Sequence, residues 1–216
     1  GHSNIDGSQK NIYNALNGSE SISNIIQTTQ IDNLDIITSN VDLSGLEVET
    51  AGDNGRAFLL RDKLSLFLKE NSPNYTHVFI DCPPSLSLLT VMALVASNSL
   101  IVPLQTEFFA LEGLTQLVKT IERVKDNLNS ELAIRGIILT MYDKRNKLSS
   151  QVEKEARDYF KDKVYNTVIP RNVRLSEAPS HGIPVLIYDK SCPGSKSYLS
   201  LTEEFLNQEK IMESAA

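Results

Sequence analysis

The sequence predicts an α/β fold in which a mostly parallel, twisted sheet is flanked by helices. Short apolar runs alternate with longer segments whose apolar positions recur at helical spacing. Strands that alternate with helices in this way form βαβ units, which are right-handed and build a parallel sheet. One run, at 78–80, is apolar at every position, which is typical of a strand buried on both faces. At 216 residues and 41% hydrophobic content, the chain is predicted to form a single domain over 1–216.

The first half of the chain alternates helices with short strands. Its predicted elements are helices at 11–16 and 21–27, a strand at 34–37, a helix at 56–70, the strand at 78–80 and a helix at 86–96. Asn17, Gly18 and Ser19 form the turn between the first two helices. In the helix at 56–70, apolar residues such as Leu60, Leu64 and Phe67 recur at helical spacing. The tripeptide at 1–3 has the form of a scar left by tag cleavage and is kept out of the fold prediction.

The second half continues the alternation with longer helices. Its predicted elements are a strand at 99–103, a helix at 111–128, a strand at 134–141, a helix at 151–160, a strand at 164–169 and a helix at 195–207. Leu111, Leu114, Val118 and Ile121 mark one face of the long helix. No internal repeat or interdomain linker interrupts this pattern.

Charge and cysteine content limit the class of protein. The net charge of −6 and the pI of about 5.2 exclude a protein whose whole surface binds nucleic acid. Residues 143–174 nevertheless hold nine Lys and Arg against five Asp and Glu, which indicates either a local anion-binding surface or a solvated helix face. Cys82 and Cys192 lie far apart without metal-ligand spacing, which fits a reducing cytoplasm. No signal peptide and no bilayer-length apolar run is recognised, so a cytoplasmic protein without membrane contact is expected.

The strand predicted at 78–80 ends on Asp81, ahead of Pro83 and Pro84. The carboxyl ends of parallel strands are where open α/β sheets bind their ligands. An apolar run that ends in an acid is the Walker B arrangement, in which the acid holds Mg²⁺ beside the phosphates of a nucleotide. The alternative is that Asp81 caps the helix that opens near Ser85.

From Asn11 onward, the chain resembles the ParA/Soj partition ATPases, relatives of MinD in the deviant Walker group of P-loop NTPases. Four stretches carry the resemblance: IDCPPSLSLLT at 80–90, VPLQTEFFALEGLTQL at 102–117, GIILTMYDKRNKLSSQV at 136–152 and VYNTVIPRNVRLSEAPSHGIPVLIYD at 164–189. The resemblance implies a P-loop NTPase-like fold of the SIMIBI type, with ATP and Mg²⁺ as cofactors. It also implies a nucleoid-associated protein that forms an ATP-sandwiched homodimer, binds DNA without sequence preference, and is stimulated by a ParB/Spo0J-type centromere-binding partner.

The resemblance assigns roles to residues at the nucleotide. Asp81 matches the Walker B acid, which usually reaches Mg²⁺ through water, and Pro83 and Pro84 match the turn that senses the γ-phosphate. The residues that match the adenine side of the site are Thr140, Met141, Pro170, Arg171 and Asn172. The simpler interpretation of Pro170 is that it only ends a strand.

The resemblance also assigns a DNA-binding surface. Arg145 and Arg174 match positions that contact DNA phosphates in the family, a role that suits the permanent charge and planar fork of a guanidinium. The lysines that would extend this surface are Lys144, Lys147 and Lys163. Glu107, Phe108 and Phe109 match a family segment whose aromatics are predicted to pack in the core or at the dimer interface. His181 is predicted to be a loop histidine without a catalytic role.

The sequence departs from the family in one respect. Family members open with a strand and a KGGVGKT-type phosphate loop, whereas no G-x-x-x-x-G-K-[ST] pattern occurs in these 216 residues. Because that loop supplies most of the electrostatic stabilisation, the chain alone is predicted to lack ATPase activity and need not bind a nucleotide. One alternative is a non-catalytic binding or dimerisation module. Another is a MinD-like membrane ATPase, but the acidic C-terminal tail at 200–216 disfavours it.

Overall fold

The computed structural model describes residues 9–71, 74–83, 85 and 87–215. The chain divides into two compact units, one built from 99–122 and 133–215 and the other from 9–98 and 123–132. Each unit has its own buried apolar clusters. The single domain expected over 1–216 stays a prediction.

The first unit is built on two parallel strands, β3 (Ser99–Gln105) and β4 (Ala133–Thr140). Their register runs from Ser99 opposite Ala133 to Gln105 opposite Thr140, with one shift after Leu100. Pro103 lies inside β3 rather than at its end. A proline fits there because, in the described part of the chain, β3 pairs with β4 alone and so has one edge that needs no donor.

The segment predicted as a strand at 164–169 runs parallel to β4 and is joined to it by two isolated bridges. Ile137 pairs with Val164, and Tyr142 pairs with Pro170. Between them, the N–H of Ile169 donates to the carbonyl of Leu139 at 2.8 Å. The carboxyl ends of β4 and of this segment are therefore neighbours at one edge of the sheet.

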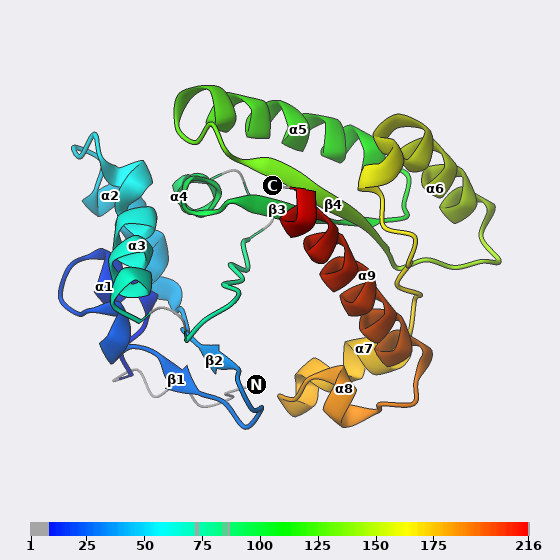
Figure 1. Cartoon of the computed structure of the whole chain (residues 1–216), viewed down its shortest axis with the longest axis horizontal. Helices are drawn as coiled ribbons and strands as arrows, with labels where there is room; N and C mark the ends of the chain where they lie inside the picture. Colours follow the sequence, from blue (N-terminus) through cyan, green and yellow to red (C-terminus); the bar gives the residue numbers. More distant parts are fainter. Residues whose placement is uncertain (1–8, 72–73, 84, 86, 216) are drawn as a thin grey trace. The chain divides into compact units, whose positions relative to one another are not determined.

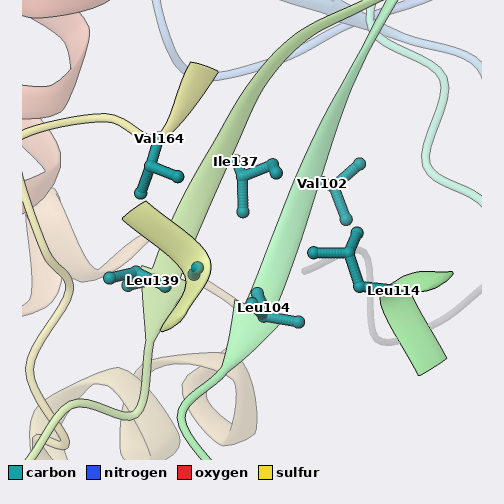
Figure 2. Close-up of a cluster of buried hydrophobic side chains, with 7 residues drawn as sticks. Val102, Leu104, Leu114, Ile137, Leu139 and Val164 are labelled. Carbon is teal, nitrogen blue, oxygen red and sulfur yellow. The ribbon is translucent and has the colours of Figure 1, made fainter. Parts of the chain in front are cut away.

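Helices cover both faces of this sheet, as Figure 1 shows. On one face, alternate residues of β3 and β4 pack with Leu114 of α5 (Ala110–Asn127) and Ala156 of α6 (Lys147–Phe160). Figure 2 shows this cluster, to which Val164 also contributes. On the other face, Tyr165 and Ile169 pack with Leu201 of α9 (Pro193–Ala215). Between α6 and α9 the chain forms the short helices η4 (Lys161–Lys163), α7 (Val173–Glu177), η5 (Ala178–His181) and α8 (Val185–Tyr188). The predicted parallel sheet flanked by helices is thus confirmed.

The second unit is mainly helical. Its helices are α1 (Ile12–Leu16), η1 (Ile22–Asn24), η2 (Val41–Gly45), α2 (Leu46–Glu49), η3 (Arg56–Phe58), α3 (Leu59–Asn71) and α4 (Leu88–Ala96). Two apolar clusters hold it together, one around Ile25 and Phe67 and the other around Leu46 and Met92. The side-chain amide of Asn129 donates to the carbonyls of Leu94, Val95 and Ser97 and so satisfies the carboxyl end of α4.

Two predicted elements in this unit are wrong. The helix expected at 21–27 is only the single turn η1, and Gln27 instead belongs to β1 (Gln27–Thr28), which pairs antiparallel with β2 (Asp35–Ile36). The strand expected at 78–80 is irregular and belongs to neither described sheet. An apolar run forms a buried strand only where other strands and helices cover it, and here Val78 and Phe79 are 51% and 75% exposed.

Candidate nucleotide and anion site

A pocket of about 720 Å³ lies at the carboxyl ends of β4 and of the segment that follows it in the sheet. It is lined by Tyr142, Asp143, Lys144, Arg145, Val168, Pro170, Arg171, Asn172, Val173, Pro193 and Ser197. Five of the residues singled out from the sequence are among them: Lys144, Arg145, Pro170, Arg171 and Asn172. The fold therefore brings three of the predicted adenine-side residues and two of the predicted DNA-binding residues to the same pocket, whereas Thr140, Met141, Lys147 and Arg174 do not line it.

The backbone at the end of β4 is fixed by several contacts. Met141 has a positive φ of 54°, a conformation that costs a non-glycine residue about 1 kcal/mol or more. The N–H of Thr106 donates to the carbonyl of Thr140 at 3.1 Å, and the N–H of Tyr142 donates to the carbonyl of Ile169 at 3.1 Å. The N–H of Arg171 in turn donates to the carbonyl of Tyr142 at 3.0 Å. These bonds lock the two sides of the pocket together.

Two similar turns follow the strand ends and carry the two arginines. The Asp143 carboxylate accepts the N–H of Arg145 at 3.0 Å, and the Asn172 amide oxygen accepts the N–H of Arg174 at 2.9 Å. The Asn172 contact caps the first turn of α7. Asn146 caps α6 in the same way by accepting the N–H of Leu148 at 3.0 Å, which places Lys147 at the start of that helix.

Both arginines form ion pairs within the unit. The guanidinium of Arg145 donates from Nε and Nη2 to the Asp143 carboxylate at 3.0 and 2.9 Å. These hydrogen bonds hold the pKa of Asp143 at about 2 and raise the pKa of Arg145. Arg174 pairs with Glu177 at 2.7 Å and with Asp189 at 3.5 Å. The Glu177 hydrogen bond raises the pKa of Arg174, and the guanidinium lowers the pKa of Glu177.

The predicted magnesium residues lie in the other unit. Asp81 and Pro83 are exposed in a segment without helix or strand, and Pro84 lies outside the described residues. Across the described ranges, no three His, Cys, Asp or Glu side chains are grouped to hold a metal ion. Mg²⁺ commonly keeps several waters and takes one or two carboxylates together with phosphates, so one accessible carboxylate such as Asp81 fits part of its shell.

The remaining candidates are not part of the pocket. Phe108 and Phe109 are 75% and 72% exposed with their rings edge to face, so the expectation that they pack in the core is wrong and packing at an interface stays a prediction. Lys163 is an exposed residue of η4. His181 ends η5, where its ring stacks on Tyr188 at 4.9 Å.

Sequence reasoning missed several residues of the pocket. Tyr142 and Asp143 directly follow β4, so their position at a strand end could have marked them. Pro193 and Ser197 come from the first turns of α9, and no local pattern connects that helix to β4.

Comparison with known proteins agrees with this architecture. A family model described as an AAA domain matches residues 2–134. The chain is 51% identical to the chromosome partitioning protein ParA of Caulobacter vibrioides, over 95% of this chain and 76% of that protein. It is 47% identical to the chromosome-partitioning ATPase Soj of Treponema pallidum, over 90% of this chain and 76% of that protein.

The fold also has a close counterpart among solved structures. Cobyrinic acid a,c-diamide synthase of Mycobacterium smegmatis with bound ATP analog and magnesium superposes with a TM-score of 0.81 at 27% identity, over 96% of this chain and 76% of that chain. The predicted P-loop NTPase-like fold is confirmed by this match. With relatives this similar over nearly its whole length, the chain belongs to the ParA/Soj family of chromosome-partitioning ATPases.

Proposed function

We propose that this chain carries the base side of an ATP site and the DNA-binding surface of a partition ATPase, in which ATP drives dimerisation and the dimer binds DNA without sequence preference. The observation that supports the proposal most directly is the pocket, because it joins residues of both kinds at the carboxyl ends of parallel strands. The partners would be a second copy of the chain and a ParB/Spo0J-type protein, and the site of action the nucleoid.

The nucleotide would be held by residues of both strand ends. Thr140, Met141, Pro170, Arg171 and Asn172 would surround the base, and the bonds between Tyr142 and the 169–171 backbone would keep that wall rigid. Asp81 would hold Mg²⁺ through an intervening water. When bound, Mg²⁺ neutralises charge on the phosphates. Asp81 is exposed and therefore accessible to a hydrated ion.

DNA would be bound through its phosphates. Arg145, Arg174, Lys144 and Lys147 are all exposed on the unit that contains the pocket, and Lys163 adds to the basic segment. Such contacts are blind to sequence and weaken as salt rises. Phe108 and Phe109 would be covered at the dimer interface, because exposed aromatic pairs of this kind are enriched where proteins meet.

Hydrolysis is expected to need a phosphate loop. Backbone N–H groups, a lysine and a hydroxyl of that loop surround the phosphates and Mg²⁺, and no matching pattern occurs in the 216 residues. The 216 residues alone are therefore expected to lack ATPase activity. The same observation favours the second candidate function, a non-catalytic binding or dimerisation module. The described part of the chain holds no helix with the length and apolar character needed to cross a bilayer.

The test is calorimetry with Mg-ATP on the 216-residue chain and on the same chain fused to a strand, phosphate loop and helix from a relative. We expect only the fusion to bind tightly and to hydrolyse ATP. In the fusion, Arg171→Ala should weaken binding, whereas Lys154→Ala on the exposed side of α6 should not. Tight binding by the 216 residues alone would contradict the requirement for the loop. If neither protein binds, the non-catalytic module becomes the better description.

A further inference from the structure

Both arginines predicted to contact DNA are already held by carboxylates of their own unit. Arg145 is bound by Asp143, and Arg174 is bound by Glu177 and Asp189. These carboxylates match no role assigned above. Because a carboxylate and a phosphate use the same guanidinium donors, the pairs bear directly on how the arginines meet DNA.

The pair at Arg145 occupies one complete edge of the guanidinium. Nε and Nη2 each donate to a different oxygen of Asp143, at 3.0 and 2.9 Å. The Asp143 carboxylate also accepts the backbone N–H of Arg145, so the acid is fixed by the turn and does not depend on the arginine side chain for its position. The Arg145 side chain is 90% exposed and accessible to a macromolecule. An incoming phosphate therefore meets a guanidinium whose charge is compensated and whose forked edge is occupied.

The charge of Arg174 is compensated by carboxylates on two sides. Glu177, three residues later on α7, accepts from Nη1 at 2.7 Å, and Asp189 lies 3.5 Å from Nε. The guanidinium also lies 6.0 Å from the centre of the Tyr188 ring, whose hydroxyl donates to Glu177 at 3.3 Å. Asp189 also stabilises the turn that follows it, since its carboxylate accepts hydrogen bonds from the backbone N–H groups of Ser191 and Cys192. Glu177 is thus the better residue to probe.

We propose that Asp143 and Glu177 are positioning residues that lower the affinity of the chain for DNA by holding Arg145 and Arg174 in competing ion pairs. The proposal rests on the DNA binding proposed above. A phosphate can bind either arginine only by displacing its carboxylate, so an isolated anion binds weakly. The closely spaced phosphates of a DNA duplex can displace both carboxylates. The acids thereby make binding depend on the charge density of the ligand.

The expected effect is modest because the pairs are exposed. Exposed ion pairs contribute little, so releasing one arginine should tighten DNA binding about two- to fivefold. Releasing both should multiply the effects, since the two pairs share no residue and act on separate arginines. If the acids instead orient the arginines toward DNA, removing them should weaken DNA binding, because an orienting partner is lost.

The experiment measures binding of a fluorescent duplex of mixed sequence by anisotropy at low salt, with Mg-ATP and the fusion that carries the phosphate loop as the parent protein. The variants are Asp143→Asn, Glu177→Gln and their combination, with Asp143→Glu as the conservative variant that keeps the charge. Asp162→Asn is the matched control, because it removes an exposed carboxylate from the same basic segment and has no contact with either arginine among the interactions described. Arg145→Ala and Arg174→Ala report whether these arginines bind DNA at all. NMR of the arginine Nε–H groups checks the pairs without DNA.

We expect both single variants to bind more tightly, the combination to bind tightest, and Asp143→Glu and Asp162→Asn to stay near the parent. Faster solvent exchange of the Arg145 Nε–H in Asp143→Asn should accompany the gain. If Asp162→Asn tightened DNA binding as much as Asp143→Asn, the effect would come from net charge alone, and the proposal would be overturned. Weaker DNA binding by Asp143→Asn would overturn it as well. If the parent binds and the arginine-to-alanine variants bind equally well, it is the proposed DNA-binding surface that fails.

Discussion

Replacing Gly136 by alanine is expected to destabilise the unit that contains the pocket, because a methyl group there would overlap the ring of Tyr165. An ideal Cβ at Gly136 would lie 2.2 Å from Cε2, 2.8 Å from Cζ and 2.9 Å from Cδ2 of that ring. Carbon atoms in contact normally stay about 3.5–4 Å apart. Tyr165 is 1% exposed and packs with Ile169 and Leu201, so the ring cannot simply swing into solvent.

The magnitude follows from this overlap. Overpacking a well-filled core costs about 1–3 kcal/mol. The ring would have to move by at least about 1.3 Å to restore normal contact, and it lies against the strand itself, so we expect a cost near the upper end, about 3 kcal/mol. For a domain of this size, about 1 kcal/mol corresponds to about 2–4 °C in Tm. Gly136→Ala should therefore lower Tm by about 6–12 °C.

The assay is thermal unfolding followed by near-ultraviolet circular dichroism, with Gly113→Ala as the matched control. Gly113 lies within α5, and an added Cβ there would meet nothing within 4 Å. The control should gain about 0.5–1 kcal/mol from the better helix propensity of alanine. Combining Gly136→Ala with Tyr165→Leu should cost less than the sum of the two single changes, since the ring is then absent. An unchanged Tm for Gly136→Ala, or strict additivity in the double variant, would refute the steric explanation.

Two further changes test contacts that support the pocket. Ser149→Ala should lower the free energy of unfolding in urea by about 1 kcal/mol, because the Ser149 hydroxyl accepts a hydrogen bond from Thr106 at 3.1 Å and both residues are buried. Adding Thr106→Val should lower it by less than a further 1 kcal/mol, because the hydrogen bond is already lost. Glu204→Gln tests the link from α9 to Asn166 and Thr167, whose N–H groups donate to Glu204 at 2.7 and 2.9 Å. Burial raises the pKa of Glu204, but these hydrogen bonds outweigh it and the net direction is downward. A lowered pKa means that the stabilisation is present above about pH 4.3 and is lost as the pH falls through the folded pKa, so the parent should lose its advantage over Glu204→Gln in acid unfolding. A constant advantage at every pH would contradict that assignment.

Three main elements of the first unit were predictable because their patterns are local. β3 and β4 are short apolar runs and α5 repeats apolar residues at helical spacing, and the structure places all three within a few residues of the predicted bounds. The segment at 78–80 was not predictable in this way, because the same apolar run can be a buried strand or an exposed irregular stretch. Which of the two forms depends on neighbours far away in the sequence.

The pocket was predictable only in part for a related reason. Pro170, Arg171 and Asn172 follow a strand directly, so their place at the end of the sheet could be read from the order of the elements. Pro193 and Ser197 reach the pocket through the packing of α9 across the sheet, which no short pattern encodes. The ion pair of Asp143 with Arg145 lies between these cases, because the two residues are close in sequence but their pairing depends on the turn that joins them.

The pocket and the two arginines are connected through very short pieces of backbone. Arg145 follows the pocket residue Asp143 by two positions, and Arg174 follows the pocket residue Asn172 by two positions. In both turns the earlier side chain accepts the backbone N–H of the arginine. The hydrogen bonds of Tyr142 with Ile169 and Arg171 join the two turns to each other. Under the proposed function, a ligand that shifts either wall of the pocket would also move the backbone that carries both arginines, and nucleotide binding would thereby have a physical route to the proposed DNA-binding surface.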